Sequence, residues 1–99
     1  MYVIREVLNC APGKVRPLLE KFRSLSEALE ARGVPPLRLL TDVSGPPFWT
    51  LVSEVTVERV EEFFAVEEEL MADPEVRAAM AGYRDLIVQG RREIYRLES

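Results

Sequence analysis

The sequence uses one strand–helix unit twice, and this internal repeat constrains the fold more than any other feature. Glu6-Val7 is followed by Val15-x-x-Leu18-Leu19, and Glu54-Val55 is followed in the same way by Val60-x-x-Phe63-Phe64. In both units, a run rich in β-branched residues gives way to apolar residues at helical spacing. Two such units predict one sheet covered by helices, and the length of 99 residues fits a single domain over residues 1–99.

The segments around the two units complete the order β-α-β-β-α-α-β. Turns are indicated by Pro12-Gly13, by Gly33 and by Ser44-Gly45-Pro46-Pro47, and Gly90 is expected to end the third helix. We expect strands at residues 2–10, 37–43, 48–57 and 91–97, and helices at residues 15–32, 60–71 and 74–89. This order is that of an α+β ferredoxin-like split βαβ sandwich, whose four-stranded antiparallel sheet places the first and third strands side by side.

The sheet face away from the helices is predicted to be apolar. Side chains alternate along a strand, and we assign Val7 and Val55 to the helix side. The opposite face then carries two carboxylates among apolar side chains, which are Tyr2, Ile4, Leu8, Phe48 and Val52. Burial of such a surface is worth roughly 25 cal/mol per Å². We therefore expect a homodimer in which two open sheet faces pack together as a barrel-like sandwich.

The overall pattern resembles the dimeric α/β-barrel superfamily, and within it NIPSNAP-like proteins. The resemblance covers nearly the whole chain and rests on short motifs, which are Arg5-Glu6, Ala11-Pro12-Gly13-Lys14, Gly45-Pro46-Pro47, Asp73-Pro74 and Arg92-Glu93-Ile94. It implies the ferredoxin-like fold and dimerisation. It leaves the function open, because this superfamily includes monooxygenases, haem enzymes, isomerases and ligand-sensing domains.

Missing residue types exclude several classes of chemistry. The chain has no histidine and one cysteine, which removes His-dependent nucleophilic catalysis, zinc cages and iron–sulfur sites. Its five glycines are scattered singly, so no phosphate-binding loop is present. The net charge of −4 disfavours a nucleic-acid partner, whose phosphates need a basic surface. We therefore expect neither a metal nor another cofactor.

No targeting or membrane segment is predicted. No apolar run approaches the ~20 residues that span a bilayer. Arg5, Glu6 and Asn9 interrupt the first ten residues, unlike the apolar region of a signal peptide. We expect a cytoplasmic protein without a membrane partner. Arg outnumbers Lys and Glu outnumbers Asp, a bias that suits a hot habitat and also follows from GC-rich codons.

Glu6 and Glu54 are the candidate catalytic residues. If the first and third strands are neighbours in register, both carboxylates point to the same face. Two close carboxylates hold one proton between them or require a cation. One interpretation is a general base in a semi-enclosed pocket. The other is a structural pair that forms salt bridges with Arg38 or Arg96 at the dimer interface.

Aromatic and arginine side chains are the candidate ligand-binding residues. Trp49, Tyr83 and Tyr95 could enclose a planar molecule, although Trp49 and Tyr83 also fit the core. Arg5 and Arg96 lie on strands that we expect to be adjacent, where they could bind a carboxylate or form surface ion pairs. Cys10 is expected to act as a small apolar residue.

These residues leave three functions open. The first is a small dimeric protein that binds a planar or acidic molecule in a cleft between the sheet and the helices. The second is a cofactor-independent monooxygenase or isomerase, with Glu6 or Glu54 as base and Arg96 or Arg5 stabilising the anion. The third is a structural or accessory protein with a filled core. Cleft volume separates the first two from the third, because binding sites enclose about 300–1,000 Å³.

Overall fold

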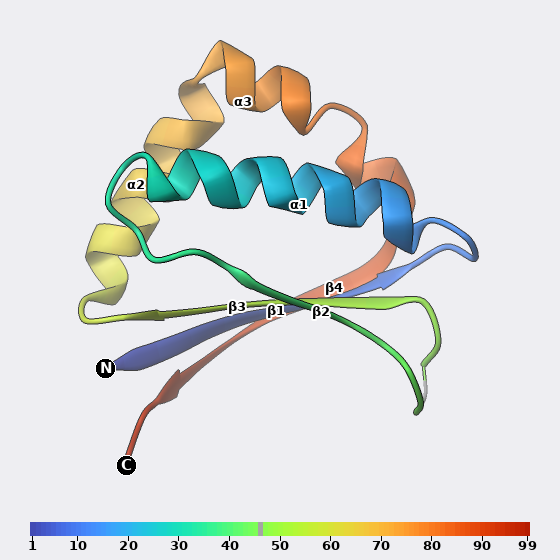
Figure 1. Ribbon diagram of the computed structural model, residues 1–99, viewed down its shortest axis with the longest axis horizontal. Helices are drawn as coiled ribbons and strands as arrows, with labels where there is room; N and C mark the ends of the chain where they lie inside the picture. The colour runs from blue at the N-terminus through green and yellow to red at the C-terminus, as the bar shows by residue number, and fades with distance from the viewer. Residues whose placement is uncertain (46) are drawn as a thin grey trace.

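The computed structural model describes residues 1–45 and 47–99, and it contains one four-stranded antiparallel sheet with helices on one face (Figure 1). The sheet order is β2-β3-β1-β4. The elements are β1 Tyr2–Cys10, α1 Val15–Glu30, β2 Arg38–Thr41, β3 Thr50–Val57, α2 Val60–Ala72, α3 Pro74–Ala79, the 3-10 helix η1 Tyr83–Leu86 and β4 Ile87–Arg96. The predicted α+β ferredoxin-like fold, with the first strand beside the third, is confirmed.

The third helix is shorter than the spacing of its apolar residues predicts. α3 ends at Ala79, and Gly82 then adopts a left-handed φ of 79° before η1. Glycine takes this conformation readily, and it ends a run of helical residues. Tyr83 nevertheless packs against the same core as Val76, so the periodicity marks a shared packing surface and not one continuous helix. β4 therefore begins at Ile87, and Gly90 lies inside this strand instead of ending a helix.

The core lies between the sheet and the helices. The predicted apolar stripe of α1 is buried, and α2 adds two buried residues. The largest fully buried side chains come from α1, β3 and α2, and they are Leu18, Leu29, Leu51 and Leu70. Among the described residues, no helix is both long enough and apolar enough to cross a membrane.

The strand β1 presents the opposite face to the one that we predicted. Ile4 and Leu8 are buried in the core, and Ile4 lies opposite Val55 in register. Val55 faces the helices as predicted, whereas Val7 lies on the open face opposite Val52. β1 carries apolar residues at both parities, so alternation along the strand does not select its face. The apolar open face that we derived from Tyr2, Ile4 and Leu8 is therefore wrong.

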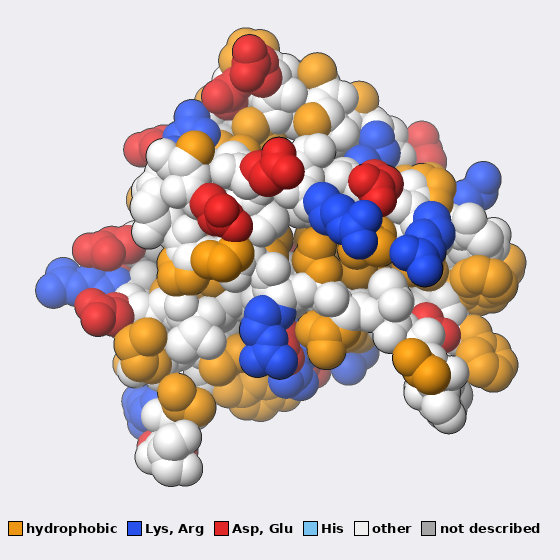
Figure 2. All heavy atoms as spheres, in the orientation of Figure 1, with side chains coloured by type: hydrophobic (Ala, Val, Ile, Leu, Met, Phe, Trp, Pro, Cys, Tyr) orange, Lys and Arg blue, Asp and Glu red, His pale blue; other side chains and the backbone are white. Residues whose placement is uncertain are grey.

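Two segments extend below the sheet on the side away from the helices. They are the β2–β3 connection and the C-terminal end of β4 (Figure 1), and Figure 2 shows them as two projections that carry hydrophobic side chains. The connection is longer than predicted, because β2 ends at Thr41 and β3 begins only at Thr50. Of the predicted turn Ser44-Gly45-Pro46-Pro47, Pro46 lies outside the described residues.

Candidate functional site

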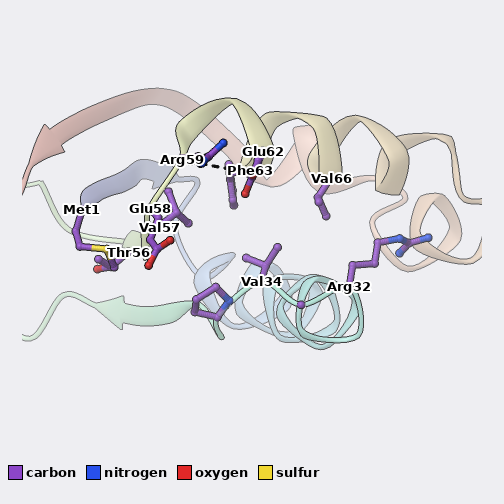
Figure 3. Close-up of a pocket in the computed structure, with 12 residues that line it drawn as sticks. Met1, Arg32, Val34, Thr56, Val57, Glu58, Arg59, Glu62, Phe63 and Val66 are labelled. Carbon is purple, nitrogen blue, oxygen red and sulfur yellow. Dashed lines mark ion pairs between the residues drawn. The ribbon is translucent and has the colours of Figure 1, made fainter.

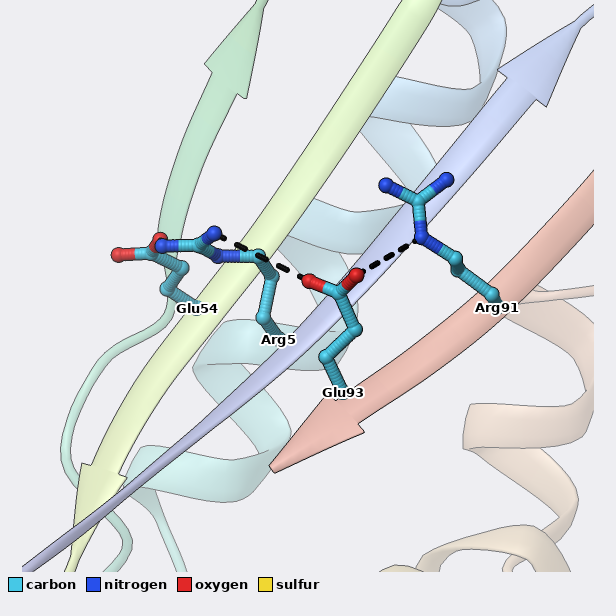
Figure 4. A network of polar contacts seen from close by, with 4 residues as sticks. All are labelled: Arg5, Glu54, Arg91 and Glu93. Atoms are coloured by element: carbon cyan, nitrogen blue, oxygen red, sulfur yellow. Dashed lines mark hydrogen bonds and ion pairs between the residues drawn. The ribbon is translucent and has the colours of Figure 1, made fainter. Parts of the chain in front are cut away.

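Arg5 occupies the centre of the open sheet face. Its Nε and Nη2 atoms lie 2.7 Å and 2.6 Å from Glu54 Oε2. The same guanidinium lies 3.9 Å from Glu93 Oε1 and 5.7 Å from the centre of the Tyr95 ring. Arg91 Nε donates to Glu93 Oε2 at 2.9 Å (Figure 4), and this hydrogen bond is the main cause that lowers the pKa of the Glu93 carboxyl. The open face thus carries a connected ionic network.

The predicted pairing of Glu6 with Glu54 on one face is wrong. The β1–β3 register places Arg5 opposite Glu54 and places Glu6 opposite Ser53. Neighbours in register share a face, so the two carboxylates lie on opposite sides of the sheet. The parity error in β1 is the reason: once Ile4 faces the helices, Glu6 must face them as well.

Glu6 belongs to a second ionic cluster, on the helix-covered face. Arg92 donates through Nε to Glu6 Oε1 at 3.0 Å and through Nη2 to Glu67 Oε2 at 2.8 Å. Its guanidinium also lies 5.2 Å from the centre of the Phe64 ring. Burial lowers the pKa of Arg92, but the hydrogen bonds with Glu67 and Glu6 outweigh burial and raise it. Arg92 therefore ties β4 to both β1 and α2.

A groove of about 380 Å³ opens between the α1–β2 connection, the end of β3 and the start of α2 (Figure 3). Phe63 and Val66 project from α2 toward Val34 on the opposite wall. Its other lining residues include Val57 at the floor and the charged residues Arg32, Glu58, Arg59 and Glu62. By contrast, the cavity enclosed deeper between the sheet and α1 and α2 measures only about 20 Å³.

The two arginines that line the groove differ in the ion pairs that they form. Arg32 lies 3.2 Å from Asp73 Oδ2 and 3.8 Å from Glu69 Oε2. Arg59 is 68% exposed, and its ion pair with Glu62 is long, at 3.9 Å. Most donors of the Arg59 guanidinium therefore face solvent at the mouth of the groove. Apolar lining residues beside an exposed guanidinium with one long ion pair suit a molecule with an apolar body and an acidic group.

The structure does not bring the predicted aromatic residues together. Trp49 is 44% exposed beside the first residue of β3 and has a φ of 63°, Tyr83 lies on η1, and Tyr95 is 50% exposed on the open face. Arg96 is exposed near the end of β4, opposite Tyr2, whereas Arg5 lies at the sheet centre. None of these five predicted ligand-binding residues lines the groove.

The sequence reasoning missed the residues that do line the groove. Val34 follows Gly33 in the connection after α1. Phe63 was predicted only as an apolar residue of the helix at residues 60–71, and Val66 was given no role. The available signal was the break Gly33-Val34-Pro35-Pro36, which turns the chain away from the helix end and leaves space there. Cys10 is buried as expected, and burial is the main cause that raises the pKa of its thiol.

Comparison with known proteins identifies the fold. No protein-family model matches the chain, and no curated protein matches it either. Among solved structures, an uncharacterised NIPSNAP domain protein from Burkholderia xenovorans superposes with a TM-score of 0.80 at 19% identity, over 100% of this chain and 96% of the other. A NIPSNAP family protein from Agrobacterium tumefaciens gives 0.80 at 15% identity, over 98% and 86%.

A third solved structure extends the similarity beyond NIPSNAP proteins. A "putative antibiotic biosynthesis monooxygenase" from Nitrosomonas europaea superposes with a TM-score of 0.76 at 16% identity, over 100% of both chains. Identities at this level show a common fold and carry no activity with them. The chain therefore has the ferredoxin-like fold that these NIPSNAP-family and monooxygenase-like proteins share, as its sequence motifs implied.

Proposed function

We propose that this chain is a homodimeric binding protein that holds a small planar or acidic molecule in the groove between α1, β3 and α2. The observation that carries the proposal is the groove itself, whose volume of about 380 Å³ falls within the usual range for small-molecule sites. Phe63 offers an aromatic wall to a planar body, and Arg59 offers donors to an acidic group. The proposed cleft is thus at the end of the helix layer and not in its tightly filled centre.

Base catalysis by a carboxylate receives less support from the geometry. Glu54 accepts both contacts of Arg5, and Glu6 accepts a hydrogen bond from Arg92. A carboxylate oxygen that already accepts hydrogen bonds from a guanidinium is not free to contact the proton of a bound molecule. Neither carboxylate lines the groove. These contacts favour a binding role over a reaction at Glu6 or Glu54.

The homodimer is proposed to form through the open sheet face. Among the exposed large hydrophobic side chains, Leu40 of β2 and Tyr95 of β4 lie on the open face by register. Val43, Phe48 and Leu97 lie on the two segments that extend below that face, whereas Ile94 lies opposite Ile4 on the helix side. The helix layer contributes only Met71 to that set among the described residues. Apolar area concentrated on the sheet is characteristic of a surface that is covered in the assembled protein.

Native mass spectrometry on freshly purified protein tests both parts together, because it reports the number of subunits and any retained small molecule. We expect a dimer that carries an added mass. The fluorescence of 1-anilinonaphthalene-8-sulfonate, which is planar and acidic, supplies a defined probe for the same groove. Binding of this probe should saturate at one site per chain.

A groove-filling variant makes the test specific. Val34→Trp places a large side chain in the groove, and it should abolish both the added mass and probe binding while the dimer persists. Ala78→Trp, at an exposed position on α3, introduces the same side chain away from the groove and should change neither. Equal probe binding by the wild-type protein and Val34→Trp would overturn the groove as the site. A monomer at micromolar concentration would overturn the dimer.

A further inference from the structure

The groove between α1, β3 and α2 carries its positive charges at two separate ends. One stripe of α2 and its N-cap faces the groove, because the lining residues of this segment recur at helical spacing: Arg59, Glu62, Phe63 and Val66. The stripe runs from a charged end at Arg59 to an apolar end at Val66, about 10 Å farther along the helix. Figure 3 shows Arg32 beyond Val66, so this second arginine lies at the other end of the groove.

The arginine at the far end is already neutralised by the chain itself. Arg32 donates through Nη2 to Asp73 Oδ2 at 3.2 Å, and its Nε atom lies 3.8 Å from Glu69 Oε2. Two carboxylates therefore share one guanidinium, and this end of the groove has an excess of negative charge. An acidic group of a ligand placed here would meet both carboxylates beside a guanidinium that they already hold, which is unfavourable.

The arginine at the near end has one weak partner. The Nε atom of Arg59 lies 3.9 Å from Glu62 Oε1, which is beyond the range of a hydrogen bond (dashed in Figure 3). Both side chains are exposed, at 68% and 71%, and an ion pair between exposed side chains contributes little. A ligand carboxylate can therefore displace Glu62, which returns to solvent. The ligand can then form with Arg59 the close two-bond contact that Glu62 does not make.

A second negative charge on the same ligand finds no further cationic side chain at the near end. Glu58 also lines the groove, and it directly precedes Arg59 in the chain. Once a ligand carboxylate binds Arg59, this end of the groove holds one guanidinium against the carboxylates of Glu58, Glu62 and the ligand. A further ligand charge, as in a phosphate monoester, adds repulsion without gaining a new cation. The charges of the groove therefore fit one acidic group and disfavour two.

We propose that the groove selects an organic acid with a single negative charge and a flat or narrow apolar body about 10 Å long, and that it rejects dianions. The ligand carboxylate replaces Glu62 on Arg59, and the apolar body lies along Phe63 and Val66 toward Val34. Glu62 is thus an internal competitor that sets both the affinity and the charge selectivity. The inference rests on the proposed function, which it deepens by giving the charge and the size of the ligand.

Four naphthalene probes share one apolar body and differ in charge. At about pH 7.5, 2-naphthoate carries one negative charge, 2-naphthyl phosphate and naphthalene-2,6-dicarboxylate carry nearly two, and 2-naphthamide is neutral. We expect 2-naphthoate to bind more tightly than each of the other probes by about 5-fold or more, because it alone gains Arg59 without placing a second charge among carboxylates. The dicarboxylate carries its second charge at the far end of the body, toward Arg32. Isothermal titration calorimetry measures all four dissociation constants.

Variants at exposed positions assign the selectivity to single side chains. Glu62→Gln removes the competing charge, so it should tighten 2-naphthoate by about 3-fold and 2-naphthyl phosphate by about 10-fold. Glu61→Gln is the matched control, since it removes the same charge from the same helical turn at an exposed residue outside the groove lining. It should change each dissociation constant by less than about 2-fold, because salt screens exposed charges. Arg59→Gln should bind 2-naphthoate no better than 2-naphthamide. Circular dichroism confirms that each variant is folded.

The outcomes separate the charge selectivity from the site on which it rests. If the wild-type protein binds none of the probes, or if Val34→Trp binds them equally well, the proposed function and the selectivity both fail. If 2-naphthoate binds in the groove but the amide or either dianion binds as tightly, the selectivity alone fails. Equal dissociation constants for Glu62→Gln and Glu61→Gln would exclude Glu62 as the internal competitor.

Discussion

Arg5 and Glu54 face each other across the two central strands, and two atoms of the Arg5 guanidinium contact the same oxygen, Glu54 Oε2, at 2.7 and 2.6 Å. The two side chains differ in exposure: 39% for Arg5 and 16% for Glu54. An exposed ion pair adds little to stability, but a largely buried carboxylate that loses its cation is costly. Loss of Arg5 should therefore be costly mainly because the Glu54 carboxylate would stay largely buried without its cation.

We expect Arg5→Ala to lower the free energy of unfolding by about 1–2 kcal/mol, because Glu54 loses its donors while it stays largely buried. Urea denaturation measures the change. Arg91→Ala is the matched control, since that arginine is 60% exposed, and it should cost less than about 0.5 kcal/mol. Removal of both charges in Arg5→Ala/Glu54→Gln should recover part of the loss. If Arg5→Ala and Arg91→Ala lowered the free energy of unfolding equally, the Glu54 carboxylate would not need its arginine partner.

Arg92 should be more important to stability than any other arginine on the sheet. Arg92→Met keeps an apolar side chain beside Phe64 but leaves Glu6 and Glu67 without their shared cation, and we expect a loss of about 2–3 kcal/mol. Arg92→Lys keeps the charge, and its stability should lie between those of the wild-type protein and Arg92→Met. An ammonium lacks the planar guanidinium that contacts both carboxylates. Arg23→Met, at a 56% exposed side chain on α1, serves as the control in the same denaturation series.

Asp73 should make stability depend on pH in acid. Its Oδ1 accepts the backbone N–H of Glu75 at 2.9 Å, and its Oδ2 accepts a hydrogen bond from Arg32 at 3.2 Å. These bonds, the first above all, lower the pKa of the Asp73 carboxyl. The unfolded chain therefore binds the proton more tightly than the folded one. The stabilisation is complete above about pH 4 and is lost as pH falls through the lower pKa of the folded state.

Two variants, Asp73→Ala and Asp73→Asn, test this dependence of stability on pH. Asp73→Ala should be less stable than the wild-type protein at pH 7, and the difference should shrink as pH falls from about 4 to about 2. Asp73→Asn keeps an oxygen acceptor for Glu75 without the charge, so it should be intermediate at pH 7. Thermal unfolding across this pH range measures the differences. A constant difference between pH 7 and pH 2 would contradict the link to the carboxyl.

Gly90 should resist substitution because of one close contact. A Cβ atom at this position would lie 2.9 Å from Cδ2 of Leu8, so the Leu8 side chain, which is 6% exposed and packed in the core, would have to shift. We expect Gly90→Ala to cost about 1–2 kcal/mol. In a Leu8→Ala background the same substitution should cost almost nothing, since the contacting atom is absent. A double-mutant cycle by urea denaturation gives the coupling, and strict additivity would exclude this contact as the cause.

The fold could be predicted because its signals are local. Strand and helix spacings, together with glycine and proline, set the order of elements without any long-range contact. The face of β1 could not be predicted in this way. Val3 and Val7 lie on one parity, and Ile4 and Leu8 lie on the other, so both faces are similarly apolar. Packing against α1 decides between them, and with it the separation of Glu6 from Glu54.

The candidate site was harder to predict because it is assembled from distant segments. Val34 follows α1, Val57 ends β3, and Phe63 belongs to α2, and only the folded chain brings them to one groove. Each of these residues is apolar and, taken alone, is typical of a core position. The Arg59 guanidinium carries the polar chemistry of the groove, but its sequence context is that of an ordinary helix start.

The central position of β1 has a consequence for how the chain folds. Its cross-strand contacts join residues far apart, as in Asn9 with Thr50, separated by 41 positions, and Glu6 with Arg92, separated by 86. Among the described residues, β2 and β3 are the only paired strands that follow each other in the sequence. Two long loops must therefore close before the middle of the sheet exists, which slows folding relative to a chain built from hairpins. β1, the first strand in the sequence, is therefore the last to have a neighbour on both sides. Until β4 pairs with it, one edge of β1 can pair with another chain.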